Sequence, residues 1–272
     1  MAQTQYFLGG NTAHGFVSFY DGFCCGERDF LWILKGGPGC GKSSFMRTIA
    51  DAAVRAGLSV EYVLCSADPS SLDGIYIPAW HTGYVDGTAP HIIEPSVPGA
   101  AGLYIDLGQF YDRAALLPKR AAIEQLQARS RACYREAYAC LRALAPQPQP
   151  LPPGKRARRF LRALTSQGLI CAQPWHSAAV QPDLSALCAR PDAVLYQHPL
   201  FPGQTEAVFL PGQNTLCRLP DEALPELTQP TALLAEARAL HDELETLYNP
   251  HVDFPRVYAL ANSHVFRLLR EN

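Results

Sequence analysis

The stretch that decides the fold is Gly36-Gly37-Pro38-Gly39-Cys40-Gly41-Lys42-Ser43. It matches the pattern G-x-x-x-x-G-K-[ST], in which glycines let the backbone close around phosphate groups so that successive N–H groups face them. A short apolar run, residues 30–35, precedes it, and a helical pattern from Ser43 to about Ala56 follows and stops at Gly57. The pattern binds phosphate when it lies between a buried strand and a helix, so the sequence predicts a phosphate-binding loop here.

Two further strands are expected beyond this unit. Residues 59–64 are typical of a buried strand, and residues 83–86 end a third, weaker one. Strand, helix and strand in succession are typical of a parallel sheet covered by helices. We therefore predict an α/β fold with a P-loop NTPase core, that is, a parallel sheet flanked by helices. A degenerate second α/β half and a helical hairpin complete the predicted architecture.

The hairpin is predicted from two segments whose small and apolar residues recur at alternating steps of three and four. In the first segment, residues 112–145, they are Ile123, Leu126, Ser130, Cys133, Ala137, Cys140 and Leu144. In the second segment they are Leu233, Ala237, Leu240, Leu244 and Leu247. This spacing predicts two helices that pack against each other.

Charge is distributed unevenly along the chain, although the net charge is only −2. Residues 113–162 hold twelve Lys and Arg and two acids, whereas residues 183–253 hold eleven acids and three Arg. One helix is therefore expected to be basic on its outer face and the other acidic. The two surfaces either face each other within the fold, or the basic one binds an anion or nucleic acid.

Domain organisation is suggested by a proline-rich segment between these regions. Residues 145–154 contain five prolines, which predicts a stiff linker at 146–154. Residues 1–145 would then form a nucleotide-binding domain that includes the long helix. Residues 155–272 would form the degenerate half with the C-terminal helices.

Within the loop, each residue type has an expected role. Residues 36–43 and the adjoining Ser44 would hold a nucleotide, with Lys42 reaching its β- and γ-phosphates. The Ser43 hydroxyl would ligate Mg²⁺. A strand-end acid is needed as a second ligand, and Asp86, which precedes a glycine turn, is the first candidate for this metal and catalytic role. Asp106, after another apolar stretch, is the alternative.

The group that activates the attacking water is less clearly marked, because no glutamate directly follows Asp86. We take Glu94 as the catalytic candidate. His91, Asp68 and Asp73 are alternatives on loops expected nearby.

An internal sequence repeat indicates a duplication. Residues 65–78 recur in pattern 133 residues later, at 198–211, and residues 7–15 recur 153 residues later, at 160–168. The larger offset of the upstream match places 20 extra residues in the first copy, where the phosphate-binding loop lies. The second copy is therefore expected to be a nucleotide-binding half that has lost its loop.

Four segments also carry a resemblance to a known family. Residues 10–16, 35–43, 71–75 and 86–91 resemble an uncharacterised bacterial family of P-loop ATPases, found mainly in clostridia and bacilli and built from two tandem nucleotide-binding halves. The resemblance is close over residues 6–112 and loose over 160–260. It implies ATP binding, with Lys42 and Ser43 as nucleotide and metal residues and Asp86 as the strand-end acid. The chain departs from the family at His14, where the family has lysine, and in lacking a second loop.

Taken together, these features predict a cytoplasmic ATP-binding protein, a Mg²⁺-dependent ATPase of unspecified substrate. One alternative is a small-molecule or nucleotide kinase with the basic segment 155–162 as a lid. The other is a nucleotide-gated module with little turnover that holds nucleic acid or a protein at residues 113–162. The cytoplasmic expectation rests on nine cysteines without C-x-x-C spacing and on an N-terminus without a leader pattern. No apolar run reaches the ~20 residues of a membrane-spanning helix, so no membrane partner is expected.

Overall fold

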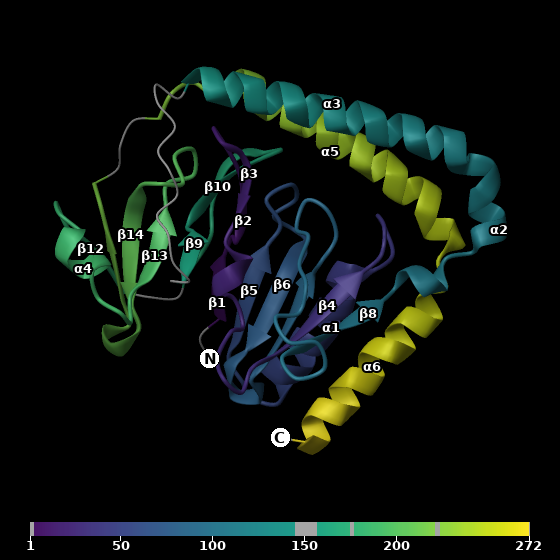
Figure 1. Ribbon diagram of the computed structural model, residues 1–272, viewed down its shortest axis with the longest axis horizontal. Coiled ribbons are helices and arrows are strands. Elements are labelled where there is room, and N and C mark those ends of the chain that lie inside the picture. Colours follow the sequence, from purple (N-terminus) through teal and green to yellow (C-terminus); the bar gives the residue numbers. More distant parts are fainter. Residues whose placement is uncertain (1–2, 145–156, 175–176, 221–223, 272) are drawn as a thin grey trace.

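The computed structural model describes residues 3–144, 157–174, 177–220 and 224–271. Figure 1 shows a larger sheet at the centre, a smaller sheet beside it and two long helices that cross above them. The larger sheet contains β1 (Gln3–Tyr6), β4 (Phe30–Lys35), β5 (Val60–Leu64), β6 (Leu72–Ile77), β7 (Thr82–Asp86) and β8 (Gly102–Asp106). The candidate loop follows β4 and leads into helix α1 (Lys42–Arg55).

The larger sheet is mixed, with strand order β1-β5-β6-β7-β4-β8. β4 runs parallel to both of its neighbours, β7 and β8, but β6 runs antiparallel to β5 and to β7. The prediction of a P-loop NTPase core with a parallel sheet is therefore wrong. The reason lies in the connections: residues 65–71, and then the single turn η2 (Pro78–Trp80), are too short for the crossover that parallel neighbours require.

The smaller sheet repeats the arrangement of the larger one. It contains β9 (Arg158–Phe160), β12 (Ser177–Val180), β13 (Val194–Gln197), β14 (Thr205–Leu210) and β15 (Thr215–Arg218) in the order β12-β15-β14-β13-β9. Strand for strand this order matches β4-β7-β6-β5-β1, and each pair has the same relative direction as its counterpart. Where the first copy has its glycine loop and α1, the second has only the short helix α4 (Ser185–Cys188).

Each copy also carries a hairpin with the same turn. The hairpins are β2 (Gly9–Thr12) with β3 (Gly15–Ser18), and β10 (Arg162–Thr165) with β11 (Gly168–Cys171). The Thr12 hydroxyl donates to the Gly15 carbonyl at 2.8 Å, and the Thr165 hydroxyl donates to the Gly168 carbonyl at 2.9 Å. Both glycines have left-handed φ angles, 90° and 98°. The two copies therefore agree in local geometry as well as in strand order.

The two copies meet about an approximate two-fold axis. Phe7 and Phe160, equivalent by sequence offset, exchange backbone N–H···O bonds of 3.0 and 2.8 Å. The turn of each hairpin contacts the other copy: Ala13 N–H donates to the Leu200 carbonyl at 3.1 Å, and the Ser166 hydroxyl donates to the equivalent Ala67 carbonyl at 2.9 Å. Reciprocal contacts between equivalent residues are the mark of an isologous interface.

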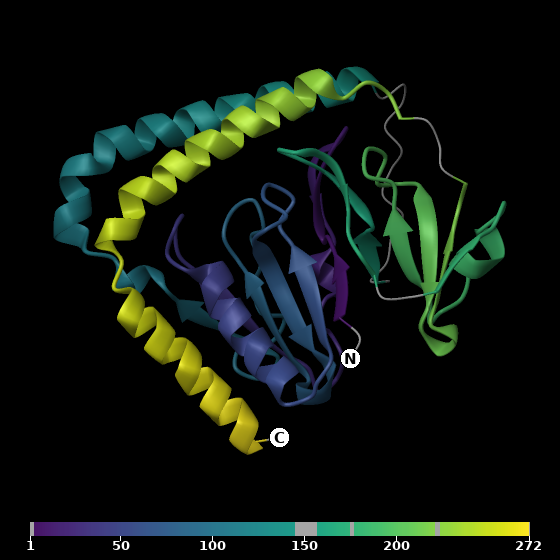
Figure 2. The same ribbon diagram turned by 180° about the vertical axis from the view of Figure 1, so that it is seen from behind.

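The two long helices, α3 (Arg120–Leu144) and α5 (Thr228–Tyr248), lie side by side in both views (Figures 1 and 2). Their buried residues differ in part from the predicted series, because Leu141 replaces Leu144 and Leu234 replaces Leu233. A nearly straight helix has 3.6 residues per turn, so a series at 3.5 drifts off the buried face. Beyond α5, the single turn η6 (Asn249–His251) leads into α6 (Phe254–Glu271), which packs on α1.

The predicted linker at 146–154 lies outside the described residues, so the domain boundaries stay a prediction. Among the helices of the described residues, none combines the length and apolar character that crossing a membrane requires.

Candidate phosphate-binding site

The loop between β4 and α1 depends on its glycines. Gly36, Gly39 and Gly41 have φ angles of 151°, 68° and 88°, in the region that L-residues with a side chain rarely adopt. Gly41 is also the residue that caps the N-terminus of α1. Backbone N–H groups at such a helix start carry a partial positive charge, which favours an anion at this position.

Lys42 folds back over this loop. Its Nζ donates to the carbonyl oxygens of Gly36 at 2.7 Å and of Gly37 at 3.0 Å. The same nitrogen lies 3.6 Å from Asp86 Oδ2, and both side chains are largely buried, with 12% and 16% of their surface exposed. The structure therefore brings together the two residues that the sequence named as lysine and strand-end acid.

Asp86 ends β7, the strand next to β4. Its Oδ1 accepts hydrogen bonds from the N–H and the hydroxyl of Thr88, at 2.8 and 2.6 Å, which leaves Oδ2 for Lys42. Asp106 ends β8 on the other side of β4, is exposed, and accepts from Gly108 N–H at 2.8 Å. Of the two candidate acids, Asp86 is the one that forms an ion pair with Lys42.

The remaining loop residues are tied to their surroundings. Ser43 Oγ accepts from Leu72 N–H at 3.0 Å, and the Pro38 carbonyl accepts from the Tyr111 hydroxyl at 2.9 Å. The Ser44 carbonyl accepts from the Thr48 hydroxyl at 3.0 Å. Cys40 is buried, and burial raises the pKa of its thiol, so it is a neutral packing residue of the loop.

Glu94, the predicted water-activating residue, is not drawn into this group. Its side chain is 65% exposed and lies 3.7 Å from Lys35 Nζ, which also donates to the Gly87 carbonyl at 2.8 Å. In the described part of the chain no ion pair joins Glu94 to Lys42.

The alternatives Asp73 and His91 form a buried pair. His91 Nε2 lies 3.1 Å from Asp73 Oδ2, and each side chain is only 6% exposed. Burial lowers the pKa of His91, but the Asp73 carboxylate outweighs it and the net direction is upward. Asp73 follows Leu72, the residue bonded to Ser43, so this buried pair lies close behind the loop. The sequence named both residues individually and did not pair them.

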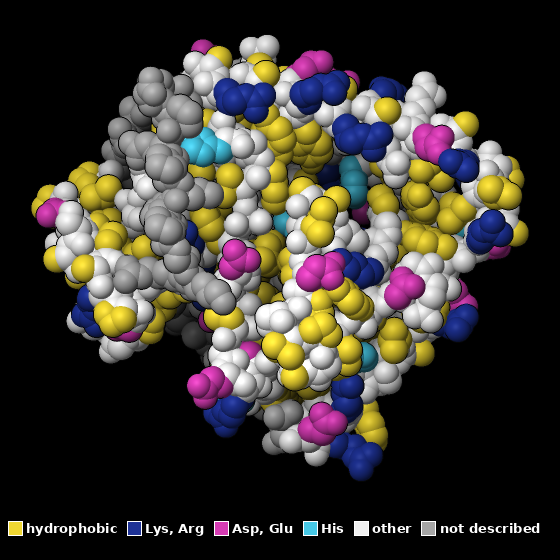
Figure 3. All heavy atoms as spheres, in the orientation of Figure 1, with side chains coloured by type: hydrophobic (Ala, Val, Ile, Leu, Met, Phe, Trp, Pro, Cys, Tyr) yellow, Lys and Arg dark blue, Asp and Glu magenta, His cyan; other side chains and the backbone are white. Residues whose placement is uncertain are grey.

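The C-terminal end of α5 covers the loop, which the sequence did not indicate. A Cβ atom built on Gly39 would overlap Asn249 Oδ1 and would lie 3.3 Å from Glu245 Cα. Two turns earlier on the helix, Arg238 Nη2 lies 3.4 Å from Oδ2 of Asp68 in the β5–β6 connection. In Figure 3 the surface is hollowed between the helices α3 and α5 and the loops beneath them, with basic and histidine side chains near the rim.

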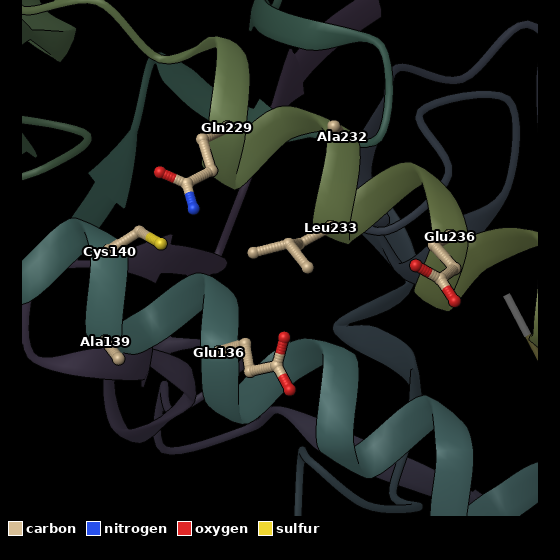
Figure 4. A pocket seen from close by; sticks show the side chains of 7 residues that line it. All are labelled: Glu136, Ala139, Cys140, Gln229, Ala232, Leu233 and Glu236. Atoms are coloured by element: carbon tan, nitrogen blue, oxygen red, sulfur yellow. The ribbon is translucent and has the colours of Figure 1, made fainter.

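A separate cavity of about 410 Å³ lies between α3 and α5. Figure 4 shows Leu233 of α5 extending into it toward Cys140 of α3, with one glutamate from each helix, Glu136 and Glu236, also lining it. None of the residues predicted for the site lines this cavity.

The basic segment expected to act as a lid lies partly outside the described residues, which exclude Lys155 and Arg156. Arg159 stacks over the Tyr6 ring at 3.7 Å and pairs with Glu61 at 2.9 Å. Glu61 is near the start of β5, whereas the loop follows the end of β4, a strand of the same direction. Arg159 therefore lies at the opposite end of the strands from Lys42.

Comparison with known proteins returns no match for this chain, whether to a protein-family model, to a curated protein or to a solved structure. The resemblance to tandem P-loop ATPases therefore stays a prediction.

Proposed function

We propose that the protein binds ATP with Mg²⁺ at the loop formed by residues 36–43 and hydrolyses it. The observation that carries this proposal is the convergence of Lys42, Ser43 and Asp86 at a glycine loop that begins a helix. The left-handed glycines support a phosphate ligand in particular, because they turn backbone N–H groups toward one place and leave no side chain between them.

The residues present suit this ligand by charge and by donor type. The loop N–H groups and Lys42 would bind the phosphate oxygens, while the Ser43 hydroxyl and the Asp86 carboxylate are the oxygen ligands that Mg²⁺ prefers. When bound, Mg²⁺ neutralises charge on the phosphate oxygens. Asp86 already holds Lys42 within 3.6 Å, so the same carboxylate orients the lysine over the loop.

Isothermal titration with a non-hydrolysable ATP analogue, followed by phosphate release from labelled ATP, tests the proposal. We expect micromolar or tighter binding that requires Mg²⁺, and release of free phosphate without an added acceptor. A folded protein that binds no adenine or guanine nucleotide would overturn it. Transfer of label to a small molecule in an acceptor panel would replace hydrolysis by a kinase reaction at the same loop.

A nucleotide-gated binding module is the second candidate, and the outer face of α3 favours it. Arg129, Arg131, Arg135 and Arg142 are exposed along this helix. A row of exposed guanidinium groups attracts polyanions through salt-dependent contacts. Retention of single- or double-stranded nucleic acid in a gel-shift assay, changed by nucleotide and weakened by salt, would support it; no retention at low salt would exclude it.

A further inference from the structure

Arg238 reaches from the helical hairpin to the edge of the sheet where the loop lies. Its side chain is 24% exposed, and Nη2 lies 2.6 Å from Asp242 Oδ1 and 3.4 Å from Asp68 Oδ2. Asp68 Oδ1 in turn accepts from Ser70 N–H at 3.0 Å, and the Ser70 carbonyl accepts from Arg47 of α1. The guanidinium is therefore held on the same side of the sheet as α1 and the loop.

One face of α5 connects Arg238 with the loop. Arg238, Glu245 and Asn249 are spaced by seven and four residues, so they lie in one row along the helix. Asn249 and Glu245 lie against Gly39. A hydrogen bond from His241 lowers the pKa of Glu245, and the positive charges of Arg238 and Lys42 lower it further. The Glu245 carboxylate therefore lies near both cations, Arg238 of α5 and Lys42 of the loop.

The Arg238 guanidinium also has N–H donors that its two ion pairs do not use. It carries five N–H groups, and both of its ion pairs within the described chain are made through Nη2. Nη1 and Nε are left to bind a further anion while the two carboxylates hold the side chain in place. The arginines on the outer face of α3 lack this arrangement because they are exposed to solvent.

We propose that Arg238 binds the terminal phosphate of the nucleotide and stabilises its charge during hydrolysis, an inference that rests on the proposed function. In that reaction a water oxygen forms a bond to the γ-phosphorus, and the bond to the β–γ bridging oxygen breaks. The electron pair of the broken bond stays on ADP, and the proton of the water passes to solvent as inorganic phosphate leaves. A guanidinium placed at the transferring group lowers the energy of this transition state more than that of bound ATP.

The test compares Arg238→Gln with Asp68→Asn and with Arg270→Gln, an exposed arginine of α6. We expect Arg238→Gln to lower kcat by about 10²- to 10³-fold while the Kd of the ATP analogue changes by less than about threefold. Arg270→Gln should stay within about threefold of wild type in both quantities, because this arginine is exposed at the end of α6. Asp68→Asn should lower kcat much less than Arg238→Gln does, because the Asp242 partner of Arg238 remains. Arg238→Lys, which keeps the charge and loses the planar fork, should fall between.

A binding measurement separates a catalytic from a merely structural role. ADP with aluminium fluoride imitates the transferring phosphoryl group, so wild type should bind it more tightly than ADP alone, and Arg238→Gln should lose that gain. If Asp68→Asn reproduces every effect of Arg238→Gln, the arginine only ties α5 to the β5–β6 connection and the inference is wrong. Hydrolysis by Arg238→Gln at the wild-type rate would reject the role of Arg238 and leave the proposed function standing. Absence of nucleotide binding by wild type would reject both the proposed function and the role of Arg238.

Discussion

Lys42 is held by acceptors that a phosphate group would replace. Because its Nζ bonds to two loop carbonyls and pairs with Asp86, it serves the loop and contributes little to the core. Lys42→Ala should weaken binding of the ATP analogue about a hundredfold, the size expected for a lost charge-assisted contact, with little change in melting temperature. Lys35→Ala is the matched control, since Lys35 pairs with Glu94 outside the loop. Unchanged affinity in folded Lys42→Ala would contradict the assignment.

Asp86 is expected to act through the metal. Asp86→Asn should therefore reduce nucleotide affinity in the presence of Mg²⁺ by tenfold or more, and in EDTA by much less, because the amide is a poorer ligand for Mg²⁺. Titrations of Asp86→Asn and of the comparison variant Asp106→Asn, with and without Mg²⁺, measure the difference. Asp106→Asn is the comparison: if it shows the metal-dependent loss and Asp86→Asn does not, the strand-end acid is Asp106.

His264 predicts how stability depends on pH. Its Nδ1 accepts a hydrogen bond from Arg267 at 3.1 Å and lies 3.1 Å from the Tyr84 hydroxyl, and burial, reinforced by Arg267, lowers its pKa to about 4. In the unfolded chain the pKa is about 6.5, so below that pH the unfolded state binds more protons and stability falls as pH falls toward 4.

Denaturant unfolding at pH 7.0 and 4.5 checks this expectation. His264→Gln should lose less stability between these pH values than wild type does. Some loss should remain, because burial lowers the pKa of His198 to about 4 as well. An identical pH dependence in the variant and in wild type would show that His264 is protonated in the folded state without cost.

Among the elements, the contact between the loop and η6 is one that a single methyl group disturbs. Gly39→Ala places a Cβ atom on Asn249 Oδ1 and forces alanine to a φ of 68°, so both stability and nucleotide affinity should fall. Gly99→Ala is a matched control, with a φ of 83° but no atom within 4 Å, and should cost only the backbone strain of about 1–2 kcal/mol. Melting temperature and analogue affinity are measured for both.

The double variant Gly39→Ala with Asn249→Ala then separates strain from overlap. Removing the amide should restore part of the affinity, because only the overlap is relieved. If the double variant is no better than Gly39→Ala alone, the end of α5 does not limit the shape of the loop.

Local features were predictable from the sequence because they depend on neighbouring residues. The glycine loop, the strand before it and the helix after it form one continuous segment, and Asp86 was found by the apolar stretch and glycine turn around it. The antiparallel strand β6 was not predicted, because the direction of a strand depends on the length of its connections and not on its own apolar pattern. The wall formed by Arg238, Glu245 and Asn249 was missed because its residues are about 200 positions from Gly39 and lie off the apolar series of α5.

The whole molecule should bind one nucleotide. The second sheet repeats the strand order of the first, but α4 stands where the loop and α1 would be, so the backbone donors, the lysine and the hydroxyl are lost together. Calorimetric titration with a non-hydrolysable analogue should give a stoichiometry of one per chain at every protein concentration tested. Two sites of similar affinity would refute this, and a concentration-dependent affinity would indicate that a second copy contributes to the site.

The repeat itself could be found in the sequence, whereas the way its copies meet could not. Short matches at two offsets reveal equivalent residues, but they carry no information on which of these residues touch. The meeting of Phe7 with Phe160 depends on how the two sheets are oriented, which many weak contacts decide together.

That approximate two-fold axis has a consequence for how the chain can change. In a homodimer every substitution enters both subunits at once, so a loop lost from one site is lost from both. Here the two copies belong to one polypeptide, and equivalent positions are free to diverge: the hairpin turns carry His14 in one copy and Gln167 in the other. Because the halves are covalently joined, they can take different roles: one half retains the ligand loop, while the other is selected only to support it.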